Sequence, residues 1–91
     1  MEITFNKEND LYVAEFEATN YFNVHIERKD HGVLAFYQRT VASGEYAEIT
    51  DFKQLIRDKV FDSDFTGVVY PKYIKIVSGV EVINAELTVK E

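Results

Sequence analysis

Apolar and polar residues alternate along most of this chain, in short runs that turn signals separate. Phe22, Val24 and Ile26 alternate with three polar residues, and the stretch from Ile83 to Val89 repeats the pattern near the C-terminus. A period of two places one set of side chains against a core and the other in solvent, which is typical of half-buried antiparallel strands. The pattern predicts strands over residues 2–6, 11–18, 21–29, 33–42, 45–49, 68–70, 72–78 and 80–90.

The period changes to about 3.6 residues over 51–61. There Phe52, Leu55, Ile56 and Val60 recur at helical spacing, with polar side chains between them. This spacing predicts one amphipathic helix in a crossover between strands, with its apolar side against the sheet. The expected fold is therefore mainly β, with α+β as the alternative class. We expect an antiparallel β-sandwich or partly open barrel of about seven strands, with one α-helix.

The last predicted strand changes the face of its apolar residues partway along. The apolar set moves from Val80 and Val82 to Ile83, Ala85 and Leu87, a shift of one position. An extra residue in one strand of a pair produces such a shift. The sequence therefore predicts a β-bulge near Val82 and Ile83.

Length and charge narrow the class of protein. The 91 residues are enough for a single compact domain spanning 1–91. The net charge is −6, and residues 1–50 carry 9 acidic and 4 basic side chains. This balance argues against nucleic acid and anionic membranes as partners. The chain has no cysteine, no basic and apolar leader and no membrane-length apolar run, so we expect a cytoplasmic protein.

One acidic motif resembles the first half of a calcium-binding EF-hand loop. Asp62, Asp64 and Gly67 match its first, third and sixth positions, but Tyr73 stands where the loop needs a bidentate glutamate. The spacing also fits a polar turn that ends the predicted helix, because aspartates bond to nearby backbone groups in turns. The turn is the favoured interpretation and no metal site is predicted, although calcium binding at Asp62 to Asp64 stays open.

The remaining polar residues suggest no reaction. His25 lies on the polar face of its strand, His31 lies in a turn, and no third metal ligand accompanies them. None of the three serines sits in a nucleophile motif, and no glycine-rich phosphate loop is present. We therefore expect no enzymatic activity, no catalytic residues and no cofactor.

Six tyrosines are the suggestive feature of the composition. Tyrosine is enriched in protein interfaces, where it buries a large area at low entropic cost, and it also stacks on sugar rings. The residues predicted to bind a partner are Tyr21, Tyr37, Tyr70 and Tyr73. An equally simple interpretation is that these tyrosines flank the core with their hydroxyls in water.

In size and composition the chain resembles small cysteine-free β-domains that serve as virion, tail or adaptor subunits. The expected function is a non-catalytic structural or protein-interaction domain, such as a subunit of a virion, a tail or another larger assembly. Its partner would be another protein or further copies of itself, and alone it would be a monomer or a weak homo-oligomer. The alternative is a small ligand-binding domain of the carbohydrate-binding type, with a concave site and aromatic walls.

Overall fold

The fold is described from a computed structural model that defines residues 1–18, 21–41, 43–49, 58–65 and 72–89. These residues form eight antiparallel strands in two sheets. The strands are β1 (Asn6–Glu8), β2 (Leu11–Ala18), β3 (Phe22–Arg28), β4 (Leu34–Arg39), β5 (Ala47–Glu48), β6 (Val60–Phe65), β7 (Lys72–Ser78) and β8 (Val82–Val89).

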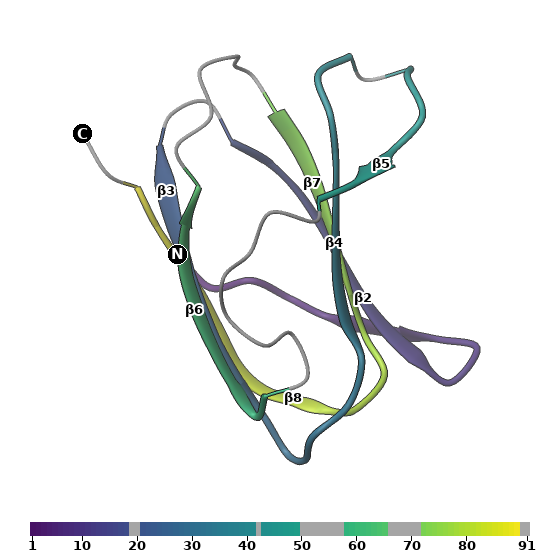
Figure 1. The fold of residues 1–91 in the computed structure, drawn as a ribbon, viewed down its shortest axis with the longest axis vertical. Coiled ribbons are helices and arrows are strands. Elements are labelled where there is room, and N and C mark those ends of the chain that lie inside the picture. The colour runs from purple at the N-terminus through teal and green to yellow at the C-terminus, as the bar shows by residue number, and fades with distance from the viewer. Residues whose placement is uncertain (19–20, 42, 50–57, 66–71, 90–91) are drawn as a thin grey trace.

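The two sheets face each other as the layers of a sandwich (Figure 1). One sheet has the strand order β1-β2-β7-β4-β5, and the other has the order β6-β3-β8. The sheets do not join into a closed barrel, so the expectation of a mainly β, sandwich-like fold is confirmed. The order within each sheet is set by pairing between strands that are mostly distant in the sequence.

The helix predicted over 51–61 is not seen. Residues 51–57 lie outside the described part of the chain, and β6 already begins at Val60. Within β6, Phe61 and Phe65 are buried, whereas Val60 is 49% exposed. Val60 is the last residue of the helical spacing that begins at Phe52, and it is also the first residue of strand β6. Pairing with β3 selects the strand, because it gives the backbone of residues 60–65 its hydrogen-bond partners.

The core lies between the sheets and is built from alternate residues of each strand. Phe22 of β3 stacks on Phe65 of β6, with ring centroids 4.8 Å apart and planes within 5°. Phe36 of β4 packs against Phe61 of β6 at 4.6 Å, so this aromatic pair joins the two sheets. Ile26, Ile74 and Ile76 are among the further residues of this core cluster that have less than 1% exposure.

The β1–β2 hairpin differs in detail from the expected strand over 2–6. Pairing begins at Asn6, opposite Val13, and the turn is made by Asn9 and Asp10. These two residues have φ angles of 49° and 69°, which asparagine and aspartate tolerate better than most residues. The turn between β1 and β2 is therefore polar, and the strand preceding it is shorter than expected and begins later in the sequence.

Residues 1–5, here called the N-terminal strap, leave the first sheet and reach the second. The Leu87 amide donates to the Met1 carbonyl at 2.8 Å, and the Ile3 amide donates to the Ala85 carbonyl at 2.9 Å. The Ile3 side chain is 8% exposed and joins the core. The strap therefore covers part of the outer edge of β8 and ties the two sheets together (Figure 1).

The predicted β-bulge is confirmed. Glu27 of β3 pairs with Asn84, but the next residue, Arg28, pairs with Val82. Ile83 is thus the extra residue, and it is 66% exposed in spite of its apolar side chain. The bulge interrupts the regular alternation of β8 and places Val82, the first residue of that strand, opposite Arg28.

Arg28 is the one charged side chain among the buried described residues, with 2% exposure. Its Nη1 donates to the carbonyls of Gly32 and Val33 at 3.0 and 3.1 Å, and to Ser78 Oγ at 3.3 Å. Its Nη2 donates to the carbonyl of Asp58. One guanidinium therefore fastens the β3–β4 connection, the end of β7 and the approach to β6.

Gly32 sits where two connections approach closely. A Cβ atom at this position would come within 2.7 Å of Cγ1 of Val80, in the β7–β8 turn. The φ angle of Gly32 is not positive, so the requirement for glycine here comes from the lack of space for a side chain and not from the backbone conformation. The missing side chain lets the β3–β4 connection lie against Val80 while its carbonyl accepts from Arg28.

Candidate functional site

The structure brings two of the four predicted tyrosines together. Tyr37 on β4 lies opposite Lys75 on β7, and the next pair along the same face is Arg39 with Tyr73. Tyr37 and Tyr73 are thus diagonal neighbours on the outer face of the five-stranded sheet. Tyr21 directly precedes β3, which is a strand of the other sheet, and is 41% exposed. Tyr70 lies outside the described residues.

A third tyrosine, which was not among the predicted site residues, completes this cluster. The Arg39 guanidinium carbon lies 4.3 Å from the ring centroid of Tyr46 and 5.7 Å from that of Tyr73. Lys75 Nζ also lies 5.7 Å from the Tyr46 ring. Cations at these distances are attracted to the ring faces. Below, Tyr37, Arg39, Tyr46, Tyr73 and Lys75 are called the tyrosine–arginine face.

Local hydrogen bonds hold Arg39 in place. Its Nη1 donates to the carbonyl of Gly44 at 2.9 Å, and the Gly44 amide donates to the Val41 carbonyl at 2.9 Å. Burial raises the pKa of the Tyr46 phenol, and the nearby Glu15 carboxylate raises it further. The phenol therefore stays protonated at neutral pH and keeps its capacity to donate a hydrogen bond.

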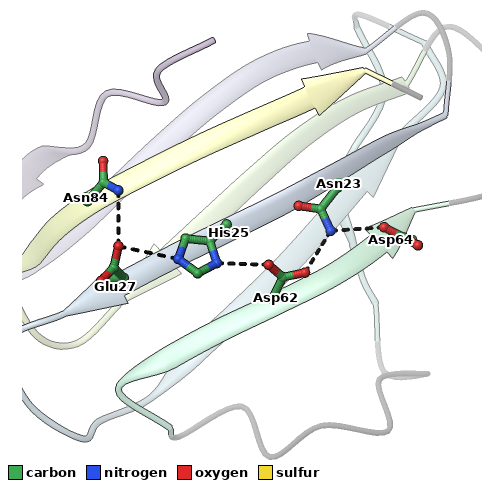
Figure 2. Close-up of polar contacts among 6 residues, drawn as sticks. All are labelled: Asn23, His25, Glu27, Asp62, Asp64 and Asn84. Atoms are coloured by element: carbon green, nitrogen blue, oxygen red, sulfur yellow. Dashed lines mark hydrogen bonds and ion pairs between the residues drawn. The ribbon is translucent and has the colours of Figure 1, made fainter. Parts of the chain in front are cut away.

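A second group of polar side chains crosses the outer face of the three-stranded sheet (Figure 2). Its centre is His25, whose Nδ1 lies 2.8 Å from Asp62 Oδ2 and whose Nε2 lies 3.4 Å from Glu27 Oε2. Asn23 donates to both Asp62 and Asp64, at 2.8 and 2.9 Å. This group, called the polar row, consists of Asn23, His25, Glu27, Asp62, Asp64 and Asn84.

The polar row shifts the titration of its members. The hydrogen bond that His25 makes to the Asp62 carboxylate raises the pKa of His25. Burial opposes this increase, and the contact with Glu27 adds a smaller increase. Hydrogen bonds from Asn23 and then from His25 lower the pKa of Asp62. The pKa of Glu27 is lowered in the same way, first by Asn84 and then by His25.

These shifts predict that the polar row stabilises the fold most in mildly acidic solution. A raised pKa of His25 gives stability that is complete below about pH 6.5 and is lost as the pH rises through the folded value. The lowered pKa of Asp62 gives stability that is present above about pH 4 and is lost as the pH falls. We therefore expect His25→Gln to remove part of the decrease in unfolding free energy between pH 6 and pH 8.5, measured by urea denaturation.

His31→Gln is the control for this measurement, because His31 lies in the β3–β4 connection, outside the polar row. The contribution of the half-exposed His25–Asp62 pair should be below about 1 kcal/mol, since solvent screens it. A pH dependence that His25→Gln and His31→Gln change equally would contradict this role of His25.

The polar row does not form a metal centre. Two of its three carboxylates, those of Glu27 and Asp62, lie at opposite ring nitrogens of His25, so they cannot converge with the imidazole on one ion. Over the ranges that the structure describes, no three histidine, cysteine, aspartate or glutamate side chains are placed to hold a metal. The expectation of a loop at Asp62 to Asp64 is wrong, because both residues lie in β6 and are exposed on the face of His25.

Comparisons with known proteins gave no relationship: no family model, no curated protein and no solved structure matches this chain. Within the described segments, no helix has the length and apolar character needed to cross a membrane.

Proposed function

We propose that this chain is a non-catalytic interaction domain that binds a protein partner through the tyrosine–arginine face. The observation that supports this most directly is the stacking of Arg39 on Tyr46, with the ring of Tyr73 also within 5.7 Å of the guanidinium carbon. Tyrosine and arginine are among the residues that supply most of the binding energy in protein interfaces. Here the sheet and the Gly44 turn hold them before any partner arrives, which lowers the entropic cost of binding.

The charges of the face favour a partner that presents a carboxylate at its centre. Arg39 and Lys75 bring two positive charges together on a chain whose net charge is −6. Glu15 and Glu17 lie opposite Lys75 and Tyr73 on β2 and form the negative border of the face. A partner with an acidic group opposite Arg39 and with neutral or basic groups around it would match this distribution.

This proposal predicts how single substitutions change affinity. Tyr46→Ala and Tyr73→Ala should each weaken binding to the purified partner by about 2 kcal/mol or more, roughly thirty-fold, measured by calorimetry. The partner would first be identified by affinity capture from the native source, with Arg39→Ala as the negative bait. Tyr21→Ala should bind like the parent, because Tyr21 directly precedes β3, a strand of the other sheet. Equal binding by all the variants would refute the proposed surface.

The carbohydrate-binding alternative is tested on the same face. The cavity at the junction between the N-terminal strap and β2 has one aromatic side chain in its lining, that of Phe16. A sugar could stack instead on the partly exposed rings of Tyr37 and Tyr73. Binding of the parent domain to a glycan array, lost in Tyr37→Ala and Tyr73→Ala, would favour this alternative over a protein partner.

A further inference from the structure

The β1–β2 pairing ends early and leaves part of β2 uncovered. β1 pairs with β2 only from Glu8, opposite Leu11, to Asn6, opposite Val13. On its other side, β2 is paired with β7 from Tyr12 to Ala18. Because the N-terminal strap turns away toward β8, no described strand lies beside residues 14–18 on the β1 side of β2 (Figure 1).

A cavity occupies the space that the strap and β2 leave between them. Its volume is about 630 Å³, within the range of sites that hold a ligand or a peptide side chain. Ile3, Val13 and Phe16 give it an apolar wall. An uncovered strand edge beside an open cavity is a surface to which another extended segment can be added.

Three carboxylates line the same cavity, namely those of Glu2, Glu8 and Glu15, and no basic side chain lines it. None of the three forms an ion pair with a described residue. Glu17 follows Glu15 on the same face of β2, two residues further along the uncovered edge.

We propose that this junction binds an extended basic segment of a partner protein. The segment adds as a strand to the edge of β2 at residues 14–18, and its backbone pairs with that edge. Side chains alternate between the two faces of an added strand. One set therefore brings Lys or Arg among Glu2, Glu15 and Glu17, while the other brings apolar groups against Ile3 and Phe16. The site shares Glu15 and Glu17 with the border of the tyrosine–arginine face. It uses none of the five residues of that face and does not depend on that proposal.

The probe that tests this is a fluorescent peptide of alternating lysine and valine, seven residues long. We expect it to bind the parent domain in a fluorescence anisotropy titration at low salt. Glu2→Gln combined with Glu17→Gln should weaken binding by about tenfold, because two of the three carboxylates that face the added lysines are lost. The matched control is Glu45→Gln combined with Glu48→Gln, which removes the same charge in β5 and just before it, on the far edge of this sheet. This control should bind within about twofold of the parent.

A second peptide separates strand addition from general charge attraction. It keeps every lysine but replaces the valines with proline, which cannot donate backbone hydrogen bonds to a strand. We expect it not to bind, and we expect the lysine–valine peptide to shift the amide resonances of residues 14–18. Equal binding of the proline peptide, equal loss in the control variant, or no binding of either peptide would overturn the proposal. Arg39→Ala should bind the lysine–valine peptide normally, so failure of this proposal and of the tyrosine–arginine face can be distinguished.

Discussion

Replacement of Arg28 by methionine is expected to lower the free energy of unfolding by about 3 kcal/mol or more. The substitution leaves three backbone carbonyls and Ser78 Oγ without the donor that the guanidinium supplies. Relief from burying a cation offsets part of this loss. For a domain of this size the melting temperature should fall by more than about 10 °C, measured by circular dichroism or calorimetry.

Two further variants show whether the shape of the guanidinium matters. Arg28→Lys should also destabilise strongly, because one ammonium cannot reach both Asp58 and the β3–β4 connection. Lys29→Met is the matched control, since Lys29 is exposed and makes only a 3.4 Å surface ion pair with Glu81. The control should stay within about 0.5 kcal/mol of the parent. A loss for Arg28→Met no greater than that of Lys29→Met would show that the buried guanidinium contributes no net stability.

Phe36→Ala should cost about 3–5 kcal/mol of unfolding free energy. Phe36 is 1% exposed and packs on Phe61 and Phe65 of the opposite sheet, with centroids 4.6 and 5.7 Å apart. Truncation at this position removes the aromatic bridge between the layers and leaves a cavity that the rigid sheets cannot close. Val89→Ala, at a position 59% exposed, should change the unfolding free energy by less than about 0.5 kcal/mol. Similar losses for the two variants would contradict the central place of Phe36.

Strands whose one face is buried could be predicted from the sequence. Residues 22–28 and, after the bulge, 84–88 show a regular alternation because one row of side chains meets the core and the other meets solvent. The bulge at Ile83 could be found for the same reason, since an extra residue inverts the alternation. β6 was missed because Val60 continued a helical spacing and Asp62 and Asp64 suggested a loop. In the sheet these aspartates lie on the exposed face, where carboxylates are tolerated.

The candidate sites could be predicted only in part, because they depend on the register between distant strands. That Tyr37 and Tyr73 share a face follows from the pairing of β4 with β7, which no local pattern encodes. The same holds for His25 and Asp62, which meet across β3 and β6. Tyr46 reaches the tyrosine–arginine face through its stacking with Arg39. The Ser-Gly pair two residues before this tyrosine predicts a turn, but nothing in the local sequence indicates which side chain the tyrosine ring will stack on.

The order of strands in the smaller sheet has a consequence for how the domain is made. Its central strand, β3, pairs only with β6 and β8, so Phe22 pairs with residues as distant in the sequence as Val89. Contacts between such distant residues are slow to form, with folding times on the order of milliseconds to seconds. During synthesis, β3 leaves the ribosome long before β8 does. Its apolar side chains therefore stay without this cover until nearly the whole 91-residue sequence has been made.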